Sequence, residues 1–243
     1  MNEGRRSPVL FLHSLAGDAA HWEAQIRHLM PERMGLAVEL PGHGISAALE
    51  PGGYAPASMA SEIWSTVDVL ALAPLALVGH SYGAAVAIAM LAQRPDAVRG
   101  ILLVDPAPDL RQAPPEEITG FLASLAPPTY EAAIREHFEG ALEDARPDVR
   151  ETVLESLGRT PRDVVVRALE SLPGFDPVGP LHAFEGPKMA VLRRRPDAPS
   201  DLHVAVPGLR ARGLPAVSHW LHMDAPAEFN AILHEFLGEV DAA

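Results

Sequence analysis

The sequence predicts an α/β protein in which a mostly parallel sheet is flanked by helices and carries an inserted all-helical lid. Up to residue 105, short apolar runs alternate with helical patterns, which is typical of βαβ units. Residues 106–186 then show helical patterns without a convincing strand, before one further apolar run and a C-terminal helix. We therefore expect residues 1–105 and 187–243 to form a core domain and residues 106–186 to form a helical cap.

The predicted strands are short runs rich in Val, Leu or Ile. They are apolar on both faces, as strands covered by helices on both sides must be. Five runs have this pattern, and they cover residues 8–12, 35–40, 75–79, 100–104 and 189–192. A weaker sixth candidate covers residues 212–216.

Helical patterns separate these strands. They cover residues 21–30, 58–72 and 81–93, and we expect Ser58 to cap the second helix with Glu62 in its first turn. Residues 81–93 are almost all small and apolar, so this helix is expected to be buried. The last helix has one apolar face, made of Phe229, Ile232, Leu233, Phe236, Leu237 and Val240.

Four helical patterns fill the expected cap, and breaks that contain proline separate them. The breaks lie at Pro127-Pro128, Pro147, Pro161 and Pro173. Helices inserted between two strands of a parallel sheet are expected over its carboxyl edge, where open α/β sheets place their sites. We therefore expect the cap to control substrate access.

The strongest catalytic signal is Gly79-His80-Ser81-Tyr82-Gly83, which lies between a strand run and a helix of small residues. This G-x-S-x-G pattern in a strand–turn–helix context is a nucleophile elbow. The glycines allow the sharp turn, which holds Ser81 Oγ at a helix N-terminus, where the helix dipole favours negative charge. A Rossmann phosphate turn is the competing interpretation, but its G-x-G-x-x-G spacing is absent. Ser81 is therefore predicted to be the nucleophile.

A serine hydroxyl needs a positioned base, and His219 is the preferred candidate. It follows the last candidate strand and precedes the C-terminal helix, so it is expected at the same sheet edge as Ser81. His222 is close enough in sequence to be an alternative. His80 lies inside the elbow and is expected to point away from Ser81.

The base in turn needs a carboxylate that fixes its tautomer, and the expected chain order is serine, acid, histidine. Asp197 is the preferred acid, because it follows the 189–192 strand and precedes His219. Asp105, at the end of the preceding strand, is the alternative acid, and Asp201 is a further candidate. The competing interpretation of Asp197 is a solvent-exposed turn.

The tetrahedral intermediate of acyl transfer requires backbone donors. The Tyr82 amide directly follows the nucleophile and is the first expected donor. The second is expected from the loop after the first strand, where the Leu15 amide is preferred. Ser14 and His13 in the same loop are candidates for supporting positions around the site.

Five segments carry a resemblance to a known family: the loop HSLAGDAAHW, the turn LPGHG, the elbow GHSYG, the strand end LLVDPAP and the tail SHWLHMDAPAEFNAILHEFL. Together they resemble the α/β-hydrolase superfamily, specifically its lid-bearing esterase, lactonase and carbon–carbon hydrolase branch. The tail is similar to the pattern G-H-x-x-x-x-E-x-P-x-x-F, with His219 at the catalytic histidine. The resemblance implies the α/β-hydrolase fold and no metal or organic cofactor.

Three positions depart from the family pattern. Ser14 and Ser218 stand where glycine is usual, and residues 193–197 lack the usual glycine, which weakens the assignment of Asp197. An arginine of the run Arg193, Arg194 and Arg195 is able to pair with a substrate carboxylate. We prefer a solvent-exposed run in which one arginine forms an ion pair.

Composition excludes several classes. With 243 residues, a net charge of −13 and no basic patch to offset it, the chain is not expected to bind nucleic acid. The absence of cysteine excludes disulfides, thiolate metal sites and a cysteine nucleophile. No apolar run approaches the roughly 20 residues that span a membrane, and the start MNEGRRSP lacks a signal-peptide pattern. We expect a cytoplasmic monomer or homodimer.

The expected cap is rich in Leu, Ala, Phe and Pro, which favours a substrate with an apolar acyl or alcohol part. The sequence therefore predicts a serine esterase that cleaves a small-molecule ester through an acyl-enzyme. Hydrolysis of a lactone or a carbon–carbon bond by the same residues is one alternative. A non-catalytic ligand receptor with the hydrolase fold is another.

Overall fold

The computed structural model describes residues 6–50, 52–194 and 197–243. Its strands form one sheet in the order β2-β1-β3-β4-β5-β6, and every pair of neighbours is parallel. The predicted parallel sheet is thus confirmed. The strands are β1 (Val9–Leu12), β2 (Gly35–Val38), β3 (Leu75–His80), β4 (Val98–Val104), β5 (Lys188–Leu192) and β6 (Arg210–Gly213).

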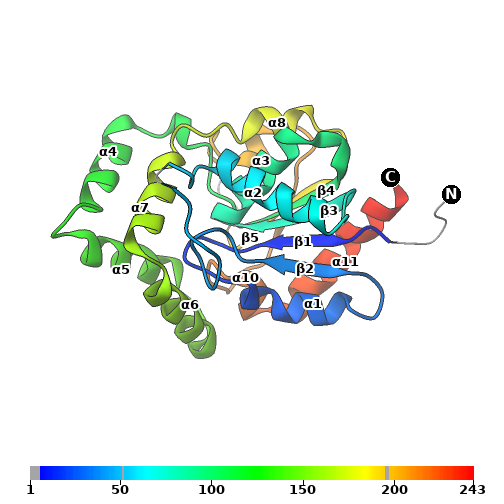
Figure 1. The fold of residues 1–243 in the computed structure, drawn as a ribbon, viewed down its shortest axis with the longest axis horizontal. Helices are drawn as coiled ribbons and strands as arrows, with labels where there is room; N and C mark the ends of the chain where they lie inside the picture. Colours follow the sequence, from blue (N-terminus) through cyan, green and yellow to red (C-terminus); the bar gives the residue numbers. More distant parts are fainter. Residues whose placement is uncertain (1–5, 51, 195–196) are drawn as a thin grey trace.

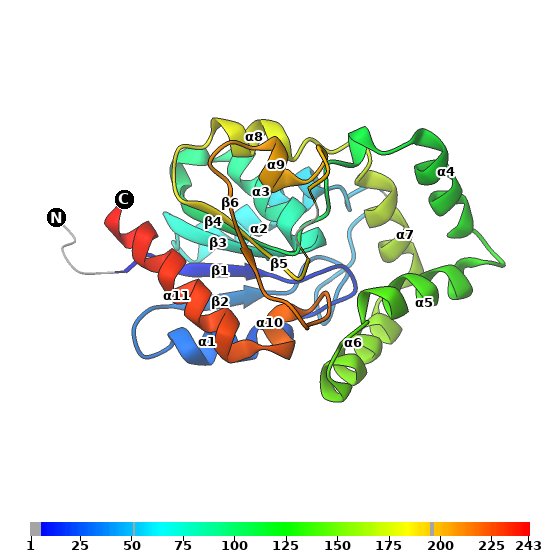
Figure 2. The same cartoon turned by 180° about the vertical axis from the view of Figure 1, so that it is seen from behind.

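Helices cover both faces of the sheet (Figures 1 and 2). One face carries α2 (Pro56–Val69), α3 (Tyr82–Gln93) and α8 (Val178–Ala183), and the other carries α1 (Glu23–Leu29) and α11 (Pro226–Ala242). Along β1, Leu10 and Leu12 join the hydrophobic core of the first face, whereas Val9 and Phe11 join that of the second. This double burial explains why the strand sequences are apolar without alternation.

The C-terminal helix packs as its sequence pattern predicts. All six residues of the predicted apolar face are buried in the core between α11 and the sheet. Short helical turns complete the core, namely η1 (Ala19–Trp22), η2 (Pro95–Ala97), η3 (Leu110–Gln112), α9 (Leu202–Ala205) and α10 (Leu221–Asp224). No helix of the described ranges is long and apolar enough to span a bilayer.

The predicted start of α2 and the predicted bounds of β6 are wrong. Helix α2 begins at Pro56 rather than after Ser58, because proline has no N–H to leave unpaired and its φ suits the first helical position. Strand β6 ends at Gly213, although residues 212–216 were the predicted run. The Leu214 amide still donates to the Leu192 carbonyl at 2.8 Å, but Pro215 has no N–H with which to continue the ladder.

The helices between β4 and β5 extend the molecule beyond the carboxyl ends of the strands (Figure 1). Four of these α-helices lie beyond the strand ends, whereas the fifth, α8, packs beside α3 on one face of the sheet. The separation of core and cap at residue 186 therefore stays a prediction, with α8 on the core side. The four outer helices are called the cap helices below, and they are α4 (Pro115–Ser124), α5 (Tyr130–Ala141), α6 (Pro147–Arg159) and α7 (Arg162–Ser171).

Five histidines are buried in the core: His13, His21, His43, His80 and His222. Burial lowers the pKa of each below its ordinary value, because the protonated imidazole would lose its hydration. The pKa is lowered furthest for His13, His80 and His222. In the unfolded chain the same side chains titrate near their ordinary value of about 6.5.

We predict that the free energy of unfolding falls as the pH is lowered through about 6.5. Below that pH the unfolded chain binds protons that the folded core excludes. Each such histidine then lowers the free energy of unfolding by up to about 1.4 kcal/mol per pH unit, until the pH reaches its pKa in the folded state. Above about pH 7 these groups are neutral in both states and contribute no slope. Urea denaturation between pH 5 and pH 8 measures the effect, within the range where carboxylates add little.

The matched variants are His222→Phe and His28→Gln. His222 stacks on Trp22 with ring centroids 4.0 Å apart, and in the described chain neither ring nitrogen has a hydrogen-bond partner. Phenylalanine keeps the stacking, so the slope should lose the contribution of one histidine. His28 is exposed, and its replacement should leave the slope unchanged. A slope in His222→Phe equal to that of the parent would contradict the account.

Candidate active site

Ser81 occupies a strained turn between β3 and α3. Its backbone has φ +53° and ψ −115°, a conformation that residues with a side chain rarely adopt. The Ser81 amide donates to the Val104 carbonyl at 2.9 Å, and the Ser81 carbonyl accepts from Ala84 at 2.9 Å in the first turn of α3. The turn is therefore held on both sides, and Ser81 lies where β3 ends.

The two glycines of the motif are required by close backbone contacts. A Cβ at Gly79 would lie 2.4 Å from the Gly83 carbonyl oxygen. A Cβ at Gly83 would lie 2.4 Å from the carbonyl oxygens of both Leu12 and His13. Any larger residue would push α3 away from β3 or from the end of β1. The predicted strand–turn–helix elbow is the observed geometry.

His219 pairs with Asp105. Its Nδ1 lies 2.6 Å from Asp105 Oδ2, and both side chains are largely withdrawn from solvent. Asp105 directly follows β4, and its amide donates to the Val191 carbonyl of β5 at 2.8 Å. The His219 amide donates to the carbonyl of Ala141, the last residue of cap helix α5, at 2.9 Å. Core and cap thus both hold the loop that carries His219.

The structure pairs His219 with Asp105, the alternative acid, and not with Asp197, the preferred one. Asp197 is exposed in the loop after β5. Asp201 accepts a hydrogen bond from the Ala198 amide at 2.7 Å within the same loop. The physical reason is strand order, because β4 is the direct neighbour of β3. The residue that follows β4 therefore emerges beside the elbow, whereas Asp197 is exposed in the loop after β5.

The other histidines near the elbow have structural partners. His80 Nε2 donates to the His219 carbonyl at 2.9 Å, so this ring supports the loop from below. His13 Nδ1 donates to the Ser14 carbonyl at 2.8 Å, and its Nε2 accepts from the Leu40 amide at 3.0 Å. Its pKa is lowered by burial and by the adjacent His43. The alternative base, His222, is buried against Trp22.

Ser81, Tyr82, Leu15 and His219 line one cavity of about 760 Å³. In the described part of the chain neither the Leu15 nor the Tyr82 amide donates to a backbone carbonyl, so both are free to bind an oxyanion. Ser14 lines the same cavity, and its buried Oγ has no partner among the described residues. No hydrogen bond links Ser81 Oγ to His219 in this part of the chain, and such contacts often tighten only with substrate bound.

Residues of the cap helices and of the core line the cavity together, and its walls are mostly apolar. Cap helix α5 also contributes His137, whose pKa is lowered by partial withdrawal from water and then by the nearby His219. No cluster of three or more His, Asp or Glu that could hold a metal ion occurs in the described residues. The apolar walls include Ile88, Leu110, Ile118, Phe121, Phe138, Leu169, Leu172, Phe175, Leu192 and Trp220.

The arginine run forms ion pairs. Arg193 Nε lies 3.2 Å from Asp105 Oδ2, and Arg194 Nη2 lies 2.6 Å from Glu143 Oε2 on the surface. Arg195 lies outside the described residues. An ion pair was expected for one arginine of the run, and two arginines form one. The partner of Arg193 is Asp105, which also pairs with His219.

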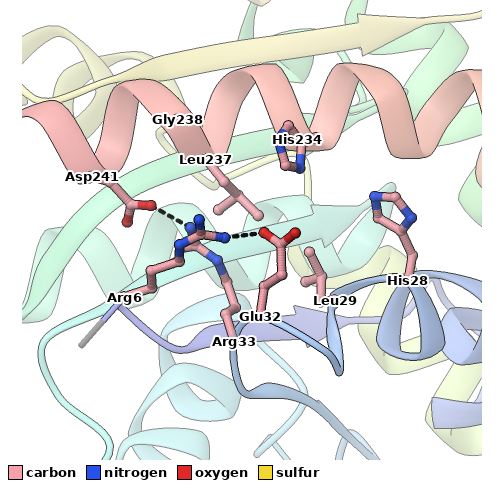
Figure 3. Close-up of a pocket in the computed structure, with 9 residues that line it drawn as sticks. All are labelled: Arg6, His28, Leu29, Glu32, Arg33, His234, Leu237, Gly238 and Asp241. Atoms are coloured by element: carbon pink, nitrogen blue, oxygen red, sulfur yellow. Dashed lines mark hydrogen bonds and ion pairs between the residues drawn. The ribbon is translucent and has the colours of Figure 1, made fainter. Parts of the chain in front are cut away.

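A second, smaller pocket of about 170 Å³ lies between α1 and α11 (Figure 3). Its cations are already neutralised, because Arg6 pairs with Glu32 and Arg33 with Asp241. His28 and His234 face each other across it, with ring centroids 6.3 Å apart. None of the nine residues drawn carries a hydroxyl group, so the larger cavity is the candidate active site.

Comparisons with known proteins identify a family for this chain. The sequence model of the alpha/beta hydrolase family matches residues 9–232. A relative, the sn-1-specific diacylglycerol lipase ABHD11 of Mus musculus, is 24% identical over 252 residues that cover 94% of this chain and 80% of the relative. Lipase LipV of Mycobacterium tuberculosis is 33% identical over 150 residues, which cover 60% of this chain and 56% of that protein.

Solved structures share the fold. The enol-lactonase from Burkholderia xenovorans LB400 aligns with a TM-score of 0.82 at 19% identity over 98% of this chain and 94% of that chain. An esterase from Thermogutta terrifontis aligns with a TM-score of 0.80 at 22% identity over 98% and 91%. The family match spans the sheet, the elbow and the His219 loop. This chain therefore belongs to the alpha/beta hydrolase family.

Proposed function

We propose that the protein is a serine hydrolase that cleaves carboxylic esters with an apolar acyl or alcohol part. The observation that carries the proposal is the 2.6 Å contact between His219 Nδ1 and Asp105 Oδ2 in a cavity that Ser81 also lines. A carboxylate on Nδ1 leaves Nε2 as the free, basic nitrogen of the ring. That nitrogen is the atom that a serine nucleophile needs.

In the first step Ser81 Oγ attacks the ester carbonyl while His219 Nε2 takes the hydroxyl proton. Asp105 keeps the proton of His219 on Nδ1 and stabilises the imidazolium that forms. The carbonyl oxygen becomes negative, and the Leu15 and Tyr82 amides donate to it. Each such donor typically contributes about 10²–10³ in rate.

In the second step the His219 imidazolium protonates the leaving alcohol, and the tetrahedral intermediate collapses to an ester on Ser81. Water enters, His219 removes its proton, and attack on the acyl carbonyl releases the acid and restores the Ser81 hydroxyl. This chemistry uses side chains and amides of the chain itself.

The cavity supports an apolar substrate. Pockets of about 300–1,000 Å³ enclose most of a drug-sized ligand, and this cavity of about 760 Å³ has Phe121 and Phe138 from the cap and Ile88 from α3 on its walls. Apolar surface buried there contributes about 25 cal/mol per Å². An acyl chain or an aromatic alcohol therefore gains more binding free energy in this cavity than a sugar or a phosphate does.

Lactone hydrolysis is the second candidate, because ring opening of a cyclic ester needs the same attack on a carbonyl. Two proteins with the same fold, an enol-lactonase and an enzyme described as degrading N-acyl homoserine lactones, have TM-scores of 0.82 and 0.76. Carbon–carbon bond hydrolysis and ligand reception without turnover remain as alternatives. Product analysis by mass spectrometry separates all four.

We predict that Ser81→Ala lowers ester hydrolysis by several orders of magnitude, because the attacking oxygen is lost. The measurement is initial rates on chromogenic acyl esters of increasing chain length. Ser61→Ala, which removes an exposed hydroxyl from α2, is the matched control and should match the parent. Rates that rise with acyl length up to an optimum would give the depth of the cavity. Equal rates for Ser81→Ala and the parent would refute the assignment of the nucleophile.

We predict that Asp105→Asn lowers kcat by about 10⁴-fold, since an amide favours the wrong tautomer of His219. The same change at Asp197 is the matched control. Asp197 is exposed, so Asp197→Asn should stay within about twofold of the parent, as surface substitutions usually do. Steady-state kinetics with the best ester measure both variants. A large loss in Asp197→Asn with little loss in Asp105→Asn would restore Asp197 as the acid.

A further inference from the structure

Arg193 contacts the same carboxylate as His219, that of Asp105. Its Nε lies 3.2 Å from Asp105 Oδ2, the same oxygen that accepts from His219 Nδ1. Its backbone amide donates to Asp105 Oδ1 at 3.3 Å. Both carboxylate oxygens therefore contact Arg193, Oδ2 through the ion pair and Oδ1 through the hydrogen bond from the amide, and these two contacts oppose rotation of the carboxylate.

The cap also contacts this arginine. Arg193 Nη1 donates to the Ala141 carbonyl at 3.4 Å, and the same carbonyl accepts from the His219 amide. Ala141 is the last residue of α5, where unpaired carbonyls give the negative end of the helix dipole. A guanidinium is favoured at such a place, so the end of α5 stabilises Arg193 in its contact with Asp105.

Arg193 and Arg194 differ sharply in environment. The side chain of Arg193 is 23% exposed and that of its partner Asp105 is 14% exposed. The side chain of Arg194 is 65% exposed, and its partner Glu143 is 62% exposed. Charges withdrawn from water interact strongly and are little screened by salt, whereas exposed pairs contribute little.

We propose that Arg193 is a positioning residue that holds Asp105 and, through its positive charge, sets the pH below which His219 can no longer accept the Ser81 proton. The inference rests on the proposed function, in which His219 is the base. When His219 is protonated, two cations share one carboxylate oxygen. The guanidinium therefore opposes formation of the imidazolium electrostatically.

Other titratable groups lie near His219 on the elements that pack against it. His80 at the end of β3 has its ring centroid 4.6 Å from that of His219, His137 faces it from α5, and His222 lies on α10. Burial lowers the pKa of His80 and His222, and partial withdrawal from water lowers that of His137, so these three are neutral near pH 7. Asp224 is held by the amide and hydroxyl of Ser218. The neutral histidines leave Arg193 as the cation that contacts Asp105 among the described residues.

The test is the pH dependence of Ser81 labelling by a fluorophosphonate, followed by intact-mass and peptide mass spectrometry. This rate needs His219 as base but no particular ester. Arg193→Met should move the midpoint of the acidic limb to higher pH by about one unit, the size expected for a charge a few ångström away. Arg193→Lys keeps the charge and should return the midpoint to within about 0.3 units of the parent.

Arg194→Met is the matched control, because it removes the neighbouring arginine from an exposed pair, and its midpoint should equal that of the parent. Circular dichroism shows whether each variant folds. If Arg193→Met does not fold, the acidic limb of Arg193→Lys is compared with that of the parent instead. An acidic limb of Arg193→Met that coincides with the parent's would overturn the proposal. A raised KM for esters in Arg193→Met, together with an unchanged acidic limb, would also overturn the proposal, because it would assign Arg193 to substrate binding.

Failure of the proposed function has a different signature, because the parent itself would then be neither labelled nor active. In that case the titration of His219 is followed by ¹⁵N-detected imidazole resonances in the same four proteins. A midpoint that rises in Arg193→Met alone supports the inference without any turnover. Identical His219 titrations in all four proteins overturn it.

Discussion

The close approach of three backbone segments at the elbow is the constraint on which the rest of the site depends. Gly79 lies against Gly83 and α3, while Gly83 lies against the carbonyls at the end of β1. These contacts leave no space for side chains, and they force Ser81 into a positive φ. The strain is offset by burial of α3, whose residues from Tyr82 to Leu91 are all buried. A buried helix thus fixes the position of Ser81.

From this fixed point the strand order assembles the remaining groups. Parallel strands all end at one edge, so Asp105 after β4 and the loop after β1 emerge on either side of Ser81. His219 reaches the same edge from the far end of the chain, held by Asp105, by His80 and by the Ala141 carbonyl. The cap helices therefore contribute more than cavity walls, because the carbonyl at the end of α5 also accepts from the His219 amide and from Arg193.

Local pattern sufficed to predict the strands, the strand–turn–helix geometry around Ser81 and the buried face of α11. Each depends on residues close in sequence, such as the glycines two positions before and after Ser81. The acid was assigned to Asp197 because the choice depends on which strand ends beside the elbow, and chain order does not state that. The signal was nevertheless present, since Asp105 directly ends a strand whereas Asp197 lies several residues into a loop. The cavity walls and the contact of Arg193 with Asp105 depend on how α5 docks, which no local pattern records.

The most direct test of the account is a crystal structure of the protein after reaction with an alkyl phosphonate, which mimics the tetrahedral intermediate. The account predicts phosphorus bonded to Ser81 Oγ, with the phosphonyl oxygen about 2.7–3.1 Å from the Leu15 and Tyr82 amide nitrogens. His219 should remain hydrogen-bonded to Asp105, and the alkyl chain should lie in the apolar cavity under α5. Phosphorus on another residue, or a phosphonyl oxygen turned away from both amides, would contradict it.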